Sequence, residues 1–214
     1  LITRMSPLAP YVRMPQNYGL EFKYVSPRKK FWQWDVFAMR GKGSQRSSSM
    51  GWRNKYYSSI KLFPLDNLTL RLSYSHENQS NWLNWIEDNL LATYDKTQRN
   101  TNFSIKYFKG NQHELRVKAQ LVAFNAKKPQ AQIADINGKL NESSMNLDSF
   151  SIGQLAFQVR YRYEFMPLAY LYAVYTKGGR VFENDEEHNL GTLYQRPWDE
   201  PSADNFTLKL RYRF

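Results

Sequence analysis

The chain has 214 residues and a formal net charge of +11. Its mean hydropathy is -0.69, and no apolar run approaches the roughly 18 residues that a membrane-spanning helix needs, which excludes a helical membrane protein. The absence of cysteine excludes a disulfide framework and thiol chemistry. Aromatic residues make up 16% of the chain, a high share for so polar a sequence and one that transmembrane β-barrels use at the membrane interfaces.

Two-residue alternation recurs along the chain far more often than helical spacing and predicts about nine strands. In the clearest of them, residues 113–125, Leu115, Val117 and Leu121 face away from charged or polar neighbours. The first seventeen residues precede this pattern and are expected to form a lead-in segment. The expected strands are residues 18–26, 31–40, 52–63, 68–76, 101–108, 113–125, 154–165, 168–176 and 205–214.

Connections of two lengths separate these strands. Tight turns are expected at residues 27–30, 64–67, 109–112 and 166–168, and long polar loops at residues 41–51, 77–100, 127–153 and 177–204. Short turns on one side and long loops on the other are typical of outer-membrane barrels, in which the long loops are extracellular. A soluble β-sandwich is the alternative, but it is not expected to sort its loops so regularly. We therefore predict an all-β fold, a transmembrane antiparallel up-and-down β-barrel spanning residues 18–214.

The segment Trp82–Gln98 is the least strand-like part of the chain. Apolar residues recur there at three and four residue spacing, which predicts a short amphipathic helix at residues 81–91 within an extracellular loop. We expect this helix to pack on the barrel rim or in the lumen. A sharper hypothesis makes Trp82 and Trp85 a stacking platform for a sugar ring or a partner protein.

No motif predicts catalysis, a cofactor or a metal. His76, His113 and His188 lie in separate segments without the spacing of zinc ligands. The acidic residues at 183–187 are read as a solvated loop, with weak cation attraction as the alternative. An outer-membrane enzyme would need a serine or an aspartate–histidine set at one rim, and none can be assembled. We therefore predict no enzymatic activity.

The chain ends on an alternating strand whose wet face carries Lys209, Arg211 and Arg213. An ordinary soluble sandwich can also end on such a strand. The segment resembles the C-terminal signal strand of bacterial outer-membrane barrels, which implies recognition by the barrel-assembly machinery and an integral location in the outer membrane of a Gram-negative cell. The residues that would form this signal are Phe206, Leu208, Leu210, Tyr212 and Phe214.

Strand parity adds a further expectation. If Phe214 ends in the periplasm, nine strands place residues 1–17 on the extracellular side. A complete bacterial barrel normally has an even strand number and begins in the periplasm. Either residues 7–13 hide a strand, which the prolines there disfavour, or the chain is the C-terminal part of a larger barrel. We expect the second.

Three segments in order, residues 82–98, 113–124 and 160–179, carry a second resemblance. Together they resemble the C-terminal barrel region of uncharacterised bacterial outer-membrane proteins that place a domain similar to carbohydrate-binding module family nine ahead of the barrel. The similarity covers residues 68–214. This sequence does not include that N-terminal domain, so the resemblance gives no ground for expecting sugar binding here. The family also supplies no catalytic residues.

The net charge would ordinarily suggest nucleic-acid binding, but the cations are dispersed along polar strand faces, so we expect no nucleic-acid partner. In a barrel these faces line the lumen, where Glu21, Glu114 and Glu164 would balance part of the charge. One interpretation is structural ion pairing, and the other is a lumen that favours anionic solutes. The predicted cationic wall comprises Lys23, Arg71, Lys106, Arg116, Lys118, Arg160, Arg162, Lys209, Arg211 and Arg213.

The function predicted from the sequence is a pore or channel, or the membrane-embedded part of a transport or export assembly. A plug or partner protein could fill it. Its surroundings would be outer-membrane lipid and lipopolysaccharide, whose phosphates Arg46, Lys55 and Arg99 could meet at the rim. The alternative is a structural anchor that displays loops or an attached domain without conducting solute.

Overall fold

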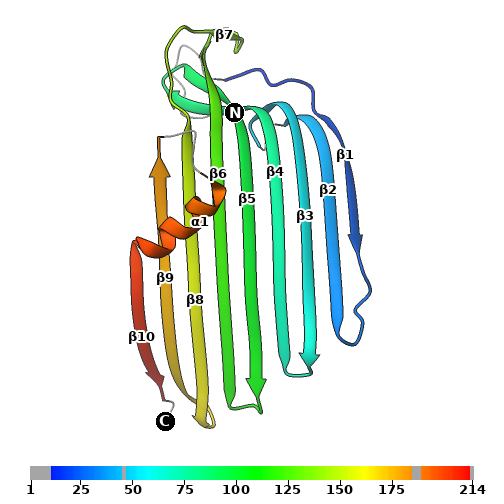
Figure 1. The fold of residues 1–214 in the computed structure, drawn as a ribbon, viewed down its shortest axis with the longest axis vertical. Helices are drawn as coiled ribbons and strands as arrows, with labels where there is room; N and C mark the ends of the chain where they lie inside the picture. The colour runs from blue at the N-terminus through cyan, green and yellow to red at the C-terminus, as the bar shows by residue number, and fades with distance from the viewer. Residues whose placement is uncertain (1–10, 45–46, 185–188, 213–214) are drawn as a thin grey trace.

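The computed structural model describes residues 11–44, 47–184 and 189–212, which form one antiparallel sheet and one helix (Figure 1). The helix, α1, spans Leu190–Asp199. The strands are β1 (Tyr18–Val25), β2 (Trp32–Ser44), β3 (Ser49–Leu65), β4 (Leu68–Glu87), β5 (Leu90–Lys109), β6 (His113–Ala134), β7 (Leu140–Glu142), β8 (Phe150–Met166), β9 (Ala169–Glu183) and β10 (Ala203–Arg211).

The strands form a meander in which neighbours in the chain are neighbours in the sheet. The order is β1-β2-β3-β4-β5-β6-β8-β9-β10, and the short β7 pairs with β6 outside this path. This confirms the predicted all-β, antiparallel, up-and-down arrangement. Within the described part of the chain no ladder joins β1 to β10, so the sheet has two free edges. Because all neighbours on the nine-strand path are antiparallel, both edge strands run in the same direction.

The two ends of the sheet differ in their connections. One end has the turns at residues 66–67, 110–112 and 167–168, where tight turns were predicted, and we call it the lower end. The upper end carries β7, the turn between β4 and β5, and residues 11–17, which run along it towards β1 (Figure 1).

The strands continue far into the segments predicted as long loops. Most of the predicted loop 77–100 is a hairpin in which β4 and β5 meet at a two-residue turn, Asp88–Asn89, so the helix expected at residues 81–91 is wrong. Within the predicted loop 41–51, β2 extends to Ser44 and β3 begins at Ser49. In the predicted loops 127–153 and 177–204 the structure adds the end of β6, β7, the end of β9 and α1.

The sheet has one apolar and one polar face through most of its area. Directly opposed residues share a face, and one such row joins Ile60, Leu72, Phe103, Ala119 and Phe157 across five strands. The neighbouring row on the other face joins Lys61, Arg71, Ser104, Lys118 and Gln158. Strict alternation along the strands therefore produces the two faces that the sequence predicted.

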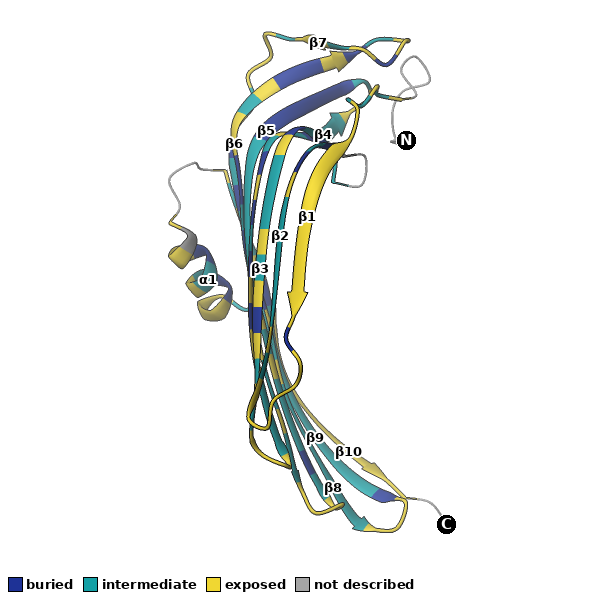
Figure 2. Cartoon of the chain, turned by 90° about the vertical axis from the view of Figure 1, so that its right-hand side faces the viewer, coloured by how far each residue is buried: buried dark blue, intermediate teal, exposed yellow. Residues whose placement is uncertain are grey.

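The sheet is bent along its length, and its two ends lean to the same side (Figure 2). Helix α1 lies on the opposite, convex side (Figure 2). The ring of Trp198 in α1 contacts that of Phe157, with ring centres 5.5 Å apart, so the convex face is the apolar one. The polar face is concave.

The seat of α1 is made by glycines. A β-carbon on Gly153 would come within 2.2 Å of the Leu193 carbonyl oxygen, and one on Gly179 within 2.8 Å of the Pro197 carbonyl oxygen. Leu193 is fully buried there. The helix begins at a cap in which the Asn189 side chain accepts from the Gly191 amide. No helix in the described segments is long and apolar enough to cross a membrane.

Two small cores lie at the upper end, on opposite faces of the β4–β5 hairpin. Leu91 is fully buried in the first, beside Leu83 and Ala134, and residues Val12 and Met14 pack against it. The adjacent residue Ala92 belongs to the second core. The sides of a strand alternate with every residue, so these two cores cover both faces of the hairpin.

This double cover explains the failed helix prediction. A strand that is buried on both faces carries apolar residues on both phases, and its sequence loses the two-residue alternation. Trp82 and Ile86 pack against the second core, whereas Leu83 lies in the first, and their combined spacing resembles that of an amphipathic helix.

Candidate functional site: the cationic concave face

The concave face carries a large excess of positive charge. Strand registers place fourteen cations and five carboxylates on it. The cations are Lys23, Arg53, Lys55, Lys61, Arg71, Lys96, Lys106, Arg116, Lys118, Arg160, Arg162, Arg180, Lys209 and Arg211, and the carboxylates are Glu21, Asp35, Glu77, Glu114 and Glu164. We call this set the cationic face.

The structure brings the predicted cationic wall together on this one face, apart from Arg213, which lies outside the described residues. Sequence reasoning missed Arg53, Lys61, Lys96 and Arg180. The signal for Lys96 was present: the alternation of Lys106, Ser104 and Asn102 continues upward through Gln98 to Lys96, into the segment that was predicted as a loop.

The predicted rim cations do not share one surface. Lys55 lies on the cationic face, opposite Glu77. Arg99 lies on the convex face, since it is opposite His76 and Ala123. Arg46 lies outside the described residues.

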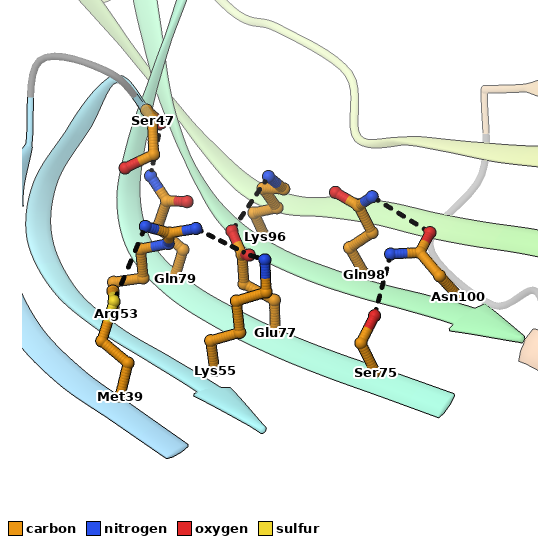
Figure 3. Close-up of polar contacts among 10 residues, drawn as sticks. All are labelled: Met39, Ser47, Arg53, Lys55, Ser75, Glu77, Gln79, Lys96, Gln98 and Asn100. Atoms are coloured by element: carbon orange, nitrogen blue, oxygen red, sulfur yellow. Dashed lines mark hydrogen bonds and ion pairs between the residues drawn. The ribbon is translucent and has the colours of Figure 1, made fainter. Parts of the chain in front are cut away.

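A buried carboxylate organises the upper part of the cationic face. Glu77 is 8% exposed and receives an ion pair from Arg53 at 2.9 Å, from Lys96 at 3.4 Å and from Lys55 at 3.7 Å (Figure 3). One carboxylate thus compensates the charges of three cations. We call this group the Glu77 hub.

Hydrogen bonds between uncharged groups continue this network of polar contacts on both sides of the hub. The Gln79 amide donates to the Ser47 carbonyl oxygen at 2.9 Å, and the Asn100 amide donates to the Ser75 hydroxyl at 3.0 Å (Figure 3). Buried polar side chains are normally hydrogen-bonded, and a connected network of them makes a surface rigid. The upper cationic face is therefore a fixed wall.

A second buried carboxylate lies near the lower end. Glu114 is 4% exposed, and it forms ion pairs with Arg116 and with Arg162, the latter at 3.3 Å. Arg162 lies directly opposite it on β8. We call this group the Glu114 hub.

Between the hubs lie four rows of the concave face, and the two nearest the Glu114 hub carry cations and no carboxylate. Lys106, Arg116 and Arg160 are directly opposed across β5, β6 and β8, and the next row holds Arg71, Ser104 and Lys118 across β4, β5 and β6. Like charges that are directly opposed across strands destabilise a sheet. We call these two rows the cationic belt.

The cations of the belt are only partly compensated. Arg71 donates to the Ser59 hydroxyl at 3.1 Å and to the Tyr57 hydroxyl at 2.9 Å, both of them neutral partners. Lys106 lies over the ring of Phe108, with its ammonium 4.9 Å from the ring centre. Within residues 11–44, 47–184 and 189–212, no carboxylate forms an ion pair with Arg71, Lys118 or Arg160.

A groove of about 720 Å³ crosses the upper row of the belt. Its side-chain donors and acceptors belong to three cations, to a tyrosine and to serine, asparagine, glutamine and threonine residues, and no aspartate or glutamate of the described residues lines it. The polar lining comprises Tyr57, Arg71, Ser73, Asn102, Ser104, Lys118, Gln120, Gln158, Thr176 and Lys177. A site with this composition can bind an anion and hydroxyl groups together.

The tryptophans of the proposed platform lie apart. Trp82 is opposite Tyr94 and packs on the Phe124 ring, on the cationic-face side of the hairpin. Trp85 is opposite Leu91, on the other side, and its indole N–H donates to the Asp88 carbonyl oxygen at 3.1 Å. The two rings therefore do not form a shared stacking surface.

The terminal strand places its apolar side chains on the convex face. Phe206, Leu208 and Leu210 are 69%, 63% and 65% exposed, and they lie opposite Tyr175, Ala173 and Leu171 of β9. Tyr212 follows the strand, and Phe214 lies outside the described residues.

The predicted absence of a metal site stays a prediction. Within the described residues no three histidine or acidic side chains group as metal ligands do. His113 contacts the Tyr161 hydroxyl at 2.7 Å and stacks on Tyr163, at the lower end of the convex face. His188 and residues 185–187 of the acidic segment lie outside the described residues, while Glu183 pairs with Arg196 of α1.

Comparisons with protein families, with curated proteins and with solved structures found no match. The resemblances noted in the sequence therefore stay predictions.

Proposed function

We propose that the chain forms part of the wall of an integral outer-membrane β-barrel, with the cationic face towards the lumen. This barrel is a pore or the membrane-embedded part of a transport assembly. The observation that carries this proposal is the separation of one continuous meander into an apolar convex face and a cationic concave face. Transmembrane barrels need this separation because one face contacts hydrocarbon and the other contacts water.

The exposure of the convex face supports a lipid contact. Outside the seat of α1, large apolar side chains remain uncovered on both edge strands and on the strands between them, such as Leu20 at 83%, Phe22 at 61% and Leu72 at 49% exposed. An apolar surface of this kind is unfavourable in water and marks a contact with a membrane or a protein. It reaches both edges of the meander, as a lipid-facing barrel wall would.

The free edges set a condition on closure. Since β1 and β10 run in the same direction, a fully antiparallel barrel would need an odd number of further strands between them. We infer that these strands come from outside the described sheet. Unpaired edges would otherwise leave backbone groups unsatisfied within the hydrocarbon, at several kcal/mol for each group.

The charge of the concave face supports an anion preference. Its cations outnumber its carboxylates, and a water-filled space enclosed by low-dielectric walls concentrates the field of those charges. Rings of Lys and Arg line pores that select anions. An open lumen built on this face would therefore favour anionic solutes.

The test is ion conductance of the protein purified from the outer membrane and reconstituted in a planar lipid bilayer. We expect current steps and, under a potassium chloride gradient, a reversal potential displaced towards that of chloride. Current with cation preference would contradict the cationic lumen, and no current under any salt or voltage would contradict the pore.

A structural anchor is the second candidate, and the two hubs favour it. Buried carboxylates at Glu77 and Glu114 each hold cations of neighbouring strands in fixed positions, as a wall needs whether or not it conducts. Absence of conductance together with outer-membrane insertion would support this candidate.

A further inference from the structure

We propose that the groove between Arg71 and Lys118 is a binding site for hydroxylated oxyanions, small solutes that carry a phosphate or carboxylate together with several hydroxyl groups. This inference rests on the proposed function in one respect, since it makes the lumen side of the wall the side that meets solutes. The groove itself is argued from its own residues.

The first argument is the placement of the two cations. Arg71 and Lys118 flank Ser104 in one row, two strand spacings apart, which is about 10 Å between their backbones. Both side chains rise from the concave face and line the same groove, so a ligand that fills the groove can meet both charges. The Ser104 hydroxyl lies between the two chains and adds a donor.

The second argument is uncompensated charge. The Glu77 hub above and the Glu114 hub below each hold their own carboxylate in ion pairs, and no carboxylate of the described residues forms an ion pair with Arg71 or Lys118. The belt between them therefore keeps Arg71 and Lys118 without an acidic partner, beside the row Lys106, Arg116 and Arg160. An oxyanion would relieve this repulsion and form charge-assisted hydrogen bonds.

The third argument is the unused donors of Arg71. Its guanidinium carries five N–H groups, and two of its nitrogens donate to Ser59 and Tyr57. These two hydroxyls fix the position of the planar group while donors remain for a ligand. An oriented arginine of this kind is suited to phosphate or carboxylate.

The rest of the groove selects the uncharged part of the ligand. Asn102, Gln120, Gln158 and Thr176 line it with amides and a hydroxyl, which both donate and accept. They match the hydroxyl groups of a polyol. A volume of about 720 Å³ is within the range of small-molecule sites. The absence of acidic lining disfavours cations.

The experiment is titration calorimetry of the purified, detergent-solubilised protein with glucose 6-phosphate as the probe. Glucose and inorganic phosphate are titrated separately as controls. Glucose presents the hydroxyl groups without the anion, and phosphate presents the anion without the polyol. We expect glucose 6-phosphate to bind more tightly than either, and Arg71→Gln or Lys118→Gln to weaken its binding about tenfold or more.

Two further variants keep the test clear. Lys127→Gln removes the same charge from an exposed position of β6 outside the groove lining, and it should bind like the wild type. Lys118→Arg keeps the charge and should retain binding, which separates lost recognition from lost folding. Circular dichroism confirms that each variant keeps its sheet.

Failure of this inference can be told from failure of the pore. Anion-selective current without binding of glucose 6-phosphate, or with binding that Arg71→Gln and Lys118→Gln leave unchanged, would overturn the groove alone. Binding that depends on both cations in a protein that passes no current would overturn the pore and support the groove.

Discussion

The lower and upper parts of the sheet are built on different principles. In the lower part, Ile60 and Leu72 lie exposed on the convex face, while Arg71 and its row lie on the concave face. At the upper end the hairpin of β4 and β5 is covered on both sides, with Leu91 in one core and Ala92 in the other. The convex face of the lower part needs an apolar environment from outside the chain, whereas both faces of the upper hairpin are covered by other residues of the chain itself.

This comparison predicts that truncation of an apolar side chain has very different effects at the two ends. Leu91→Ala should lower the free energy of unfolding in detergent by about 4 kcal/mol, because Leu91 is fully buried and its cavity cannot fill. Leu72→Ala, the matched lower change, should cost less than about 1 kcal/mol there. Denaturant unfolding in micelles measures both, and equal losses would break the comparison.

The second prediction concerns the carboxylate of the upper concave face. Glu77→Gln leaves Arg53, Lys55 and Lys96 to repel one another and should cost about 3 kcal/mol, because it removes the shared partner of cations that are mostly shielded from water. Glu164→Gln at the lower end is the control, since a Gln oxygen can still accept from the Leu168 amide. A similar loss in both variants would contradict the structural role of the Glu77 hub.

The third prediction tests the glycine seat of α1 on the convex face. Gly153→Val should cost about 2 kcal/mol and detach the helix, because its side chain would occupy the position of the Leu193 carbonyl. Detachment should change the fluorescence of Trp198 and open residues 190–199 to protease. Gly191→Ala adds a methyl group in ordinary contact, 3.7 Å from Asn189, and should leave the helix in place.

The smallest effect is expected in the turn between β6 and β7. Backbone hydrogen bonds from Lys139 and Asn137 to the Asp135 carboxylate hold its pKa below the ordinary value. The charged form therefore stabilises the turn above the pKa of the unfolded chain, and this is lost as pH falls through the lowered folded value. The protection factors of the amides of residues 137–139, in which the intrinsic pH dependence of exchange is divided out, should fall only over that acidic range, and Asp135→Ala should abolish this fall.

The two regions also differ in how much the sequence could predict. Where the two faces meet different surroundings, as along Leu68 to Ser75, alternation predicted strands and their faces, and it grouped Arg71 with Lys118 and Arg160. Where both faces are buried, as from Trp82 to Leu91, it failed. The hubs were beyond prediction because Glu77 on β4 meets partners from two other strands, β3 and β5, whose register no single segment reveals.

The central claim is that the convex face contacts lipid and the concave face contacts water. The native chain has no cysteine, so single spin labels can be placed at Leu70, Arg71, Leu72 and Ser73 of β4 in bilayers. The account predicts that oxygen, which partitions into lipid, relaxes the labels at 70 and 72, while a water-soluble nickel complex relaxes those at 71 and 73. Equal access of the nickel complex to all four positions would contradict it.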